Sequence, residues 1–203
     1  MKFFAELNDN ITIRYKGGAM DNGAESYSRF LDGDRDALTE IIREYRDGMI
    51  FFVDGIVNDF GLAEEVVQEV FIKLIVKKPK YSSKSSFRTW LYAICRNLAF
   101  DFLRKSVRKS ARYADELNNL TDEKNLEEEY IKEEQRIAIR KVMRVLNSDY
   151  CQVLYLTFFE GFDNSEAAKI MRKSNRQIEN LIYRAKKALK SELEREGIVY
   201  EKL

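Results

Sequence analysis

The sequence predicts an all-α protein made of two small helical domains joined by an acidic linker. Three observations support this fold class. Apolar residues recur at intervals of three, four and seven over residues 28–105, and again from residue 130 onward, which is the period of a helix. Between these segments acidic side chains are concentrated and apolar ones are sparse. The 203 residues are enough for one large or two small domains.

Composition excludes several classes of function. Hydrophobic residues make up 45% of the chain and charged residues 34%, which is typical of a soluble globular protein. Histidine is absent, so His-based catalytic triads and His-ligated zinc sites are excluded. Cys95 and Cys151 occupy apolar helical positions and suggest neither a disulfide nor a metal site, so we expect no cofactor.

Charge and hydropathy bear on location and partners. No apolar run is long enough to cross a bilayer, and no leader with a cleavage site is visible, so we expect a cytoplasmic protein with no membrane insertion. The net charge of +1 is compatible with nucleic-acid binding, because binding depends on where the cations are placed.

Residues 1–27 are predicted to be a polar N-terminal extension. Residues 16–20, with the sequence KGGAM, read like a translated purine-rich ribosome-binding site followed by a start codon. This pattern leads to the hypothesis that the native product begins at Met20.

The first domain is predicted over residues 28–105. Its first long helix can be capped by Asp34 or Asp36, and Gly48 and Gly55 make a bend in that helix plausible, at about 1 kcal/mol each relative to alanine. Residues 59–61 break the chain.

A second helix is expected at about 62–77, with Glu65, Gln68 and Glu69 away from its apolar side. The helix macrodipole alone accounts for acids near this helix's start. Pro79, the single proline, ends it and opens a basic, hydroxyl-rich loop that contains Tyr81.

The third predicted helix, residues 86–105, combines an apolar stripe with a basic and aromatic surface. The stripe comprises Phe87, Trp90, Leu91, Ile94, Cys95, Leu98 and Phe102. The remaining surface carries Arg88, Thr89, Tyr92, Arg96, Asn97, Arg104 and Lys105. Such cations, rings and amides hold phosphates and stack on unpaired bases. An ordinary amphipathic helix with a solvated basic face explains the same pattern, and this segment alone leaves both interpretations open.

Two residues of this helix are predicted to be structural. Asp101 falls within the apolar arc, where a lone charge is costly, so we expect it to pair with Arg104 or Asn97. Trp90 could be a wedge at the edge of opened DNA, but a core position is the more common case for tryptophan.

After residue 105 the chain is first basic and then strongly acidic, and residues 106–126 are predicted to form an extended or partly ordered linker. The second domain is predicted over residues 127–203. Residues 146–149 stop one helix and cap the next, which Gly161 closes. A short helix, a turn at residues 172–174 and a longer helix from Asn175 then form a helix-turn-helix.

In the longer helix, apolar residues at helical spacing predict one buried face, made of Ile178, Leu181, Ile182, Ala185 and Leu189. The polar residues are left for duplex DNA, with arginine suited to guanine and asparagine or glutamine to adenine. These candidate duplex-binding residues are Ser174, Asn175, Arg176, Gln177, Asn180, Arg184 and Lys187.

Three segments, in this order, resemble the sigma-70 family of RNA polymerase sigma factors, and specifically its extracytoplasmic-function group. Residues 86–104, SFRTWLYAICRNLAFDFLR, are similar to the family's promoter-melting helix. Residues 63–71, AEEVVQEVF, resemble its polymerase-docking helix, and the helix-turn-helix completes the pattern. The resemblance spans about residues 28–195 and implies that the two domains are sigma-2-like and sigma-4-like.

The resemblance also implies roles for particular residues. Glu65, Gln68 and Glu69 would meet the coiled-coil clamp of the polymerase's largest subunit. Capture of the melted non-template strand would use Lys80, Tyr81, Lys84, Arg88, Arg96, Asn97, Arg104 and Lys105. The expected partners are core RNA polymerase and promoter DNA, and family habit alone adds an anti-sigma factor.

Two departures from the family pattern stand in the helix-turn-helix. The turn has Arg172 and Lys173 where members often have glycine and an apolar residue, which puts the turn geometry in doubt. Glu179 replaces a common basic residue, which suggests a different base preference or weaker phosphate binding.

Two other classes compete with an alternative sigma factor that has no chemistry of its own. A stand-alone regulator would bind duplex DNA unaided through the same helix-turn-helix, usually as a dimer. An enzyme acting on nucleic acid is the weakest candidate, because the sequence has no metal-ligand cluster, histidine or phosphate-cradling glycine loop.

Overall fold

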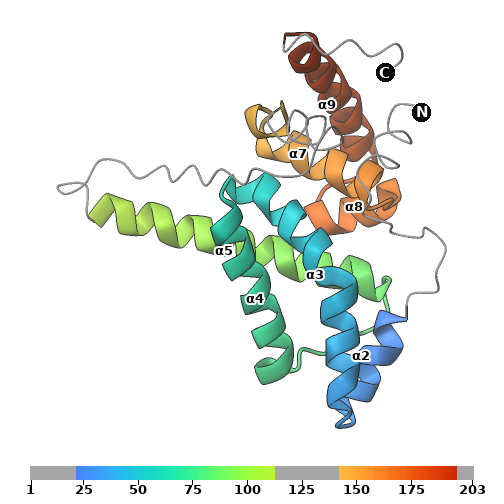
Figure 1. Cartoon of the computed structure of the whole chain (residues 1–203). Helices are drawn as coiled ribbons and strands as arrows, with labels where there is room; N and C mark the ends of the chain where they lie inside the picture. Colours follow the sequence, from blue (N-terminus) through green and yellow to red (C-terminus); the bar gives the residue numbers. More distant parts are fainter. Residues whose placement is uncertain (1–21, 113–141, 196–203) are drawn as a thin grey trace, which may run out of the picture.

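The computed structural model describes residues 22–112 and 142–195, with side chains omitted over 107–112. Every regular element in these ranges is a helix, as predicted (Figure 1). In chain order they are α2 (Gly23–Leu31), α3 (Arg35–Val57), α4 (Phe60–Lys77), α5 (Phe87–Arg112), α7 (Ser148–Leu154), the π-helix η1 (Tyr155–Phe159), α8 (Asn164–Met171) and α9 (Asn175–Arg195). None of the helices in these ranges is both long and apolar enough to span a membrane.

Helices α2 to α5 form the first helical module. Asp34, one of the two predicted caps, begins α3 by accepting hydrogen bonds from the backbone N–H groups of Asp36 and Ala37. Asp59 caps α4 in the same way through Leu62. Helix α3 continues through Gly48 and Gly55 without interruption, so neither glycine ends the helix.

Helix α2 begins at Gly23, inside the segment predicted to be an extension, because its side chains complete the core of this module. Tyr27 is buried and its ring packs on Phe87, with centroids 5.4 Å apart. Gly23 lies so close to Phe87 and Tyr45 that an added Cβ would be 2.5 Å from each of them. The hypothesis about Met20 concerns residues outside the described ranges.

The second module comprises α7, η1, α8 and α9. Asn147 caps α7 through the N–H of Tyr150, as the sequence predicted for this stop and restart. Gly161 has φ of +66° and closes the segment after η1, as predicted. Asp163 and Glu166 then form a reciprocal capping box at the start of α8.

The two modules pack against each other across α5. Figure 1 shows α5 crossing the molecule with α2 on one side and α8 and α9 on the other, while α3 runs past α5 and contacts α7 directly. Buried residues of both modules belong to one hydrophobic cluster. Aromatic contacts bridge the boundary, including Phe52 with Tyr155 and Tyr92 with Phe162, whose ring centroids are 6.3 and 5.1 Å apart.

Helix α5 differs from its prediction in two ways. It continues to Arg112, seven residues past the predicted end at Lys105. It is also buried on two sides: Phe87, Leu91 and Cys95 form the predicted stripe, but Tyr92 and Thr89 are buried as well. Placing these two on a polar surface was wrong, because the second module covers that side of the helix.

Candidate nucleic-acid interface

The outward face of α9 gathers the polar residues that were predicted to contact duplex DNA. All seven of them are exposed, while Ile178, Ala185 and Leu189 are buried beneath the helix. The helical spacing of Arg176, Asn180 and Lys187 places their side chains in one row. A row of cations and amides on an open helix face can enter the major groove and hydrogen-bond base edges.

Tyr183 lies within this row and was not among the predicted residues. Its side chain is 73% exposed, and its position on the helix falls between those of Arg176 and Glu179. The same three- and four-residue spacing that selected Asn180 could have found it. An exposed ring at this point can contact a thymine methyl group or a sugar.

Ser174 and Gln177 fix the start of α9 through each other's backbone. The N–H of Ser174 donates to Gln177 Oε1 at 2.8 Å, and the N–H of Gln177 donates to Ser174 Oγ at 3.3 Å. This is a capping-box arrangement, which satisfies two N–H groups that the helix leaves without partners. Both side chains therefore support the helix as well as facing outward.

The turn before α9 keeps its geometry without glycine. Arg172 adopts the left-handed conformation, with φ of +55°, and its N–H donates to the carbonyl of Ala168. Lys173 forms an ion pair with Asp149 of α7 at 2.9 Å. The turn that the sequence put in doubt therefore does form, with Arg172 in a left-handed conformation that glycine adopts more easily.

Helix α4 presents a second open surface. Glu65, Gln68 and Glu69 are exposed on one face, which continues into Ile72, Ile75 and Val76, exposed by 48%, 45% and 66%. Only the polar half of this face was predicted from the sequence, although the apolar half follows at the same spacing. We name this set of six residues the α4 strip.

The loop between α4 and α5 carries Lys80 and Lys84 at its surface. Tyr81 instead packs against Phe87 and Trp90, with ring centroids 5.5 and 5.4 Å away, and its hydroxyl donates to the carbonyl of Ser85. Trp90 is half-buried in this aromatic group, the core position predicted for it. In this conformation the Tyr81 ring is engaged inside the protein.

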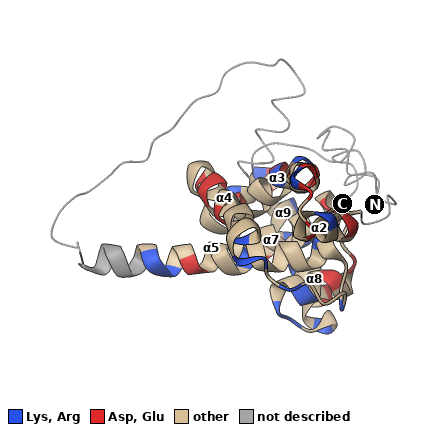
Figure 2. Cartoon of the chain, turned by 90° about the horizontal axis from the view of Figure 1, so that it is seen from below, with Lys and Arg blue, Asp and Glu red and all other residues tan. Residues whose placement is uncertain are grey.

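The C-terminal part of α5 projects past α4, and Figure 2 shows basic residues on the projecting part. Arg104 and Lys105 are exposed there. Asp101 pairs with Arg104 at 2.8 Å, as predicted, but its side chain is 51% exposed. Placing Asp101 within the apolar arc was wrong, because its side chain is exposed while Phe102 and Leu103 of the same turn pack against the core.

The N-terminal part of α5 places its cations against the second module. Arg88 contacts Glu160, and the Nε of Arg96 donates to Gln152 Oε1 at 2.7 Å. Burial lowers the pKa of Arg96, the nearby charge of Arg172 lowers it further, and Asp149 opposes this. Asn97 is half-buried. The predicted strand-binding residues are thus divided: Lys80, Lys84, Arg104 and Lys105 are open, and Arg88 and Arg96 are covered.

Comparison with known families identifies both modules. The model for sigma-70 region 2 matches residues 41–109, and the model for sigma-70 region 4 matches residues 136–189. Together the matches cover more than half of the chain. They coincide with the helices that carry the α4 strip and α5, and with the helix-turn-helix.

Curated relatives and solved structures agree with this. The chain is 27% identical over 157 residues to RNA polymerase sigma factor SigZ of Bacillus subtilis (strain 168), which covers 77% of this chain and 87% of SigZ. It is 26% identical to ECF RNA polymerase sigma factor SigX of the same organism, covering 74% of this chain and 80% of SigX. The fold is similar to that of the sigma factor RpoE solved with the anti-sigma factor NepR from Bartonella quintana, with a TM-score of 0.64, 19% identity, and coverage of 77% and 96%.

Proposed function

The chain belongs to the extracytoplasmic-function group of the sigma-70 family, and from that membership we propose how its surfaces divide the work of starting transcription. As a sigma factor it directs promoter-specific transcription by RNA polymerase. The observation that carries the proposal is the separation of two open surfaces of different chemistry: the polar row on α9 and the acidic and apolar α4 strip.

The exposed polar side chains of α9, here called the α9 row, are proposed to read the upstream promoter element while the DNA is double-stranded. Arg176 can donate two hydrogen bonds to guanine, and Asn180 can pair with adenine, whereas Arg184 and Lys187 suit flanking phosphates. Binding should therefore weaken steeply as salt increases, because each phosphate contact releases a counterion. The capping box of Ser174 and Gln177 supports the proposal by holding the helix start in place.

The α4 strip is proposed to dock on core RNA polymerase. Its acids and glutamine suit a basic or amide-rich partner, and Ile72, Ile75 and Val76 add an apolar contact area. Apolar side chains exposed together on one helix mark interaction surfaces. On the basis of the family resemblance, the proposed partner is the coiled-coil clamp of the largest subunit.

Capture of the melted non-template strand is proposed for the loop at residues 79–86 together with α5. Lys80, Lys84, Arg104 and Lys105 offer cations for its phosphates. Extruding a base costs a few kcal/mol, and stacking on an aromatic side chain returns about 1 to 3 kcal/mol. If Tyr81 is the stacking ring, it has to leave its contacts with Phe87 and Trp90 first.

The remaining assignments follow from the same role. We propose a cytoplasmic location, because the polymerase works there, and we expect the polymerase and not this chain to make the RNA. RpoE of Bartonella quintana was solved with an anti-sigma factor, and an anti-sigma factor is a proposed partner here too. We also propose a first domain that begins with α2 at Gly23 and includes α5 to Arg112, a second domain at 127–203, and a linker between them.

One experiment tests the function directly. The purified chain is added to core polymerase with a promoter library randomised at the upstream and downstream elements, and the templates that give transcripts are sequenced. We expect recovery of a defined pair of elements that depends on both proteins. Tight duplex binding by the chain alone, with no association with the polymerase, would instead indicate a stand-alone regulator.

A further inference from the structure

Helix α2 holds the start of the loop at residues 79–86, which is proposed to capture the opened strand. The hydroxyl of Tyr27 donates to the backbone carbonyl of Pro79 at 2.8 Å, across 52 residues of sequence. Tyr27 is 1% exposed, and burial raises the pKa of its hydroxyl to about 12, so the group stays protonated and remains a donor at neutral pH. One buried side chain of α2 thus fixes the first residue of this loop.

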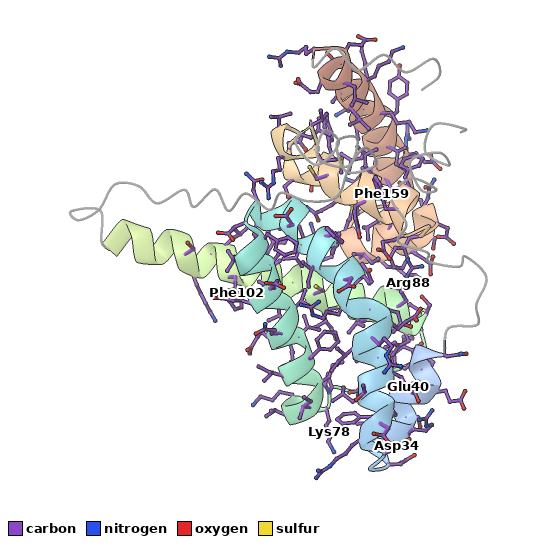
Figure 3. The ribbon with its side chains drawn as sticks, viewed as in Figure 1. Asp34, Glu40, Lys78, Arg88, Phe102 and Phe159 are labelled. Carbon is purple, nitrogen blue, oxygen red and sulfur yellow. The ribbon has the colours of Figure 1, made fainter. Side chains whose placement is uncertain are left out.

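The residue before Pro79 adds a second contact with α2. Lys78 ends α4 in the left-handed conformation, with φ of +42°, and its Nζ lies 5.5 Å from the centroid of the Phe30 ring (Figure 3). Ser83, farther along the loop, has φ of +55°. A residue with a Cβ adopts this region at a cost in free energy, so other contacts must hold the loop in its conformation. Tyr27 and Phe30 supply two such contacts at its start.

The ring of Tyr27 also belongs to the aromatic group around Tyr81. Its centroid is 5.4 Å from that of Phe87 and 5.4 Å from that of Trp90. Tyr81 packs on the same two rings, and its hydroxyl donates to the carbonyl of Ser85 within the loop. Tyr27 therefore contacts the two rings that Tyr81 would leave in order to stack on an unpaired base.

An outward turn of the Tyr81 ring would release one attachment of the loop and keep another. The bond from Tyr81 to Ser85 lies within the loop and has to break if the ring turns outward. The bond from Tyr27 to Pro79 joins the loop to α2 and needs no change. Two residues of chain span at most about 7 Å, so the Cα of Tyr81 moves only within that distance of a fixed Pro79.

We propose that Tyr27 is a positioning residue for strand capture: it fixes the start of the loop on α2, so that Tyr81 and the loop lysines meet the opened strand at one place. The proposal rests on the proposed function of this loop. A loop that is already held in place loses less conformational entropy when it binds, which makes binding tighter. The sequence placed Tyr27 in an N-terminal extension, whereas this proposal gives it a part in choosing the captured base.

Tyr27→Phe tests the proposal, because it removes the hydroxyl and keeps the ring. The variant is compared with the wild-type chain in the library assay with core polymerase. Preference at the downstream element, where the strand opens, should fall about three- to tenfold, the range that corresponds to one neutral hydrogen bond. Preference at the upstream element should stay at the wild-type level, since the Tyr27 hydroxyl bonds to the loop and not to α9.

Ser26→Ala is the matched control on the same helix. It removes a hydrogen bond of α2, from the Ser26 hydroxyl to Glu40 of α3 at 2.8 Å, and leaves the contact with the loop intact. If α2 acts only by packing, the two variants should change initiation alike. Wild-type preference at the downstream element in Tyr27→Phe, or an equal loss of preference in Ser26→Ala, would overturn the proposal.

A second measurement needs no polymerase. Trp90 is the single tryptophan of the chain and contacts both Tyr27 and Tyr81, so its fluorescence reports on the loop. Acrylamide should quench Trp90 more strongly in free Tyr27→Phe than in the wild-type chain or Ser26→Ala, because the start of the loop is released. Equal quenching in the three chains would contradict the proposal.

The two measurements also separate this inference from the proposed function. If the wild-type chain itself yields no transcripts with core polymerase, the proposed function is wrong and the inference falls with it. If the wild-type chain initiates and Tyr27→Phe keeps its base preference, only the inference is wrong.

Discussion

Arg172 holds a backbone conformation that costs stability in the helix-turn-helix. Its φ of +55° lies in the left-handed region, which a residue with a Cβ occupies at a cost of about 1 to 2 kcal/mol. Arg172→Gly should therefore raise the free energy of unfolding by about 1 kcal/mol, measured by denaturant titration. Lys169→Gly, at an ordinary exposed position of α8, should lower it by about 1 kcal/mol. A loss of stability in Arg172→Gly would mean that the arginine side chain stabilises the turn.

Gly23 is required by close packing. Because a Cβ there would lie 2.5 Å from the Phe87 ring and from the Tyr45 hydroxyl, Gly23→Ala should lower the free energy of unfolding by about 1 to 3 kcal/mol. Gly61→Ala, whose Cβ would lie 3.5 Å from its nearest neighbour, is the matched control and should not lower stability, because alanine favours a helix over glycine by up to about 1 kcal/mol. If both variants unfold at the same denaturant concentration, α2 is not packed on α5 as described.

For single residues, the sequence predicted the contacts that form between near neighbours along one helix. The pairing of Asp101 with Arg104 and the capping by Asn147 involve residues three apart, and both are present. The burial of Tyr92 and Thr89 was missed because it depends on Phe162 and on Glu166 of α8, which are far away in the sequence. Periodicity identifies one apolar face, and it cannot reveal a polar face that a second module covers.

In α9, the side chains proposed to read bases can be changed separately from the side chain that caps the helix. Arg176 and Asn180 have exposed side chains, so Arg176→Ala or Asn180→Ala should relax the upstream preference by about 1 to 3 kcal/mol without loss of stability. Gln177→Ala should also destabilise the helix start, because Ser174 loses its capping partner. Promoter selection from the library and thermal unfolding of the same three variants check this. Unchanged selection by the first two would show that the row is not the reading surface.

Helix α4 gives the corresponding test for the polymerase. Gln68→Ala with Glu69→Ala should weaken association with core polymerase while the unfolding transition is preserved, because both side chains are exposed. Ile72→Ser with Val76→Ser should also weaken the association with polymerase, because both substitutions remove exposed apolar side chains. Each Å² of apolar surface that the complex no longer buries lowers the binding free energy by about 25 cal/mol. Titration of labelled polymerase measures both effects. Full affinity in both variants would exclude the α4 strip as the docking surface.

Element types were predictable, whereas two element properties were not. The first long helix was predicted to contain Gly48 and Gly55, and α3 does pass through both, because packing of its apolar face outweighs about 1 kcal/mol of propensity per glycine. Gly55 also lies close to Cys151 of the other module, a contact that propensity cannot report. The short π-helix at Tyr155–Phe159 has no simple sequence signature either.

For the whole molecule, the sequence indicated two modules but not their contact, because the residues that join them follow no local period. The buried residues of both modules form one hydrophobic cluster, with Glu160 and Arg88 paired at the boundary. The surfaces proposed to act on separate partners are thus joined in one packed body. Calorimetry can decide whether the two modules unfold as one cooperative unit.

Packing through one shared core should make the wild-type chain unfold in a single calorimetric transition. Gly55→Leu inserts a side chain against Cys151 at the boundary, so it should split the transition in two, although leucine favours helix α3 by about 1 kcal/mol over glycine. Adding Cys151→Ala to Gly55→Leu makes room at the same contact and should bring the two transitions back together, a coupling that a double-mutant cycle quantifies. Two transitions in the wild-type chain would show that the modules unfold independently and that their packing contributes little to stability.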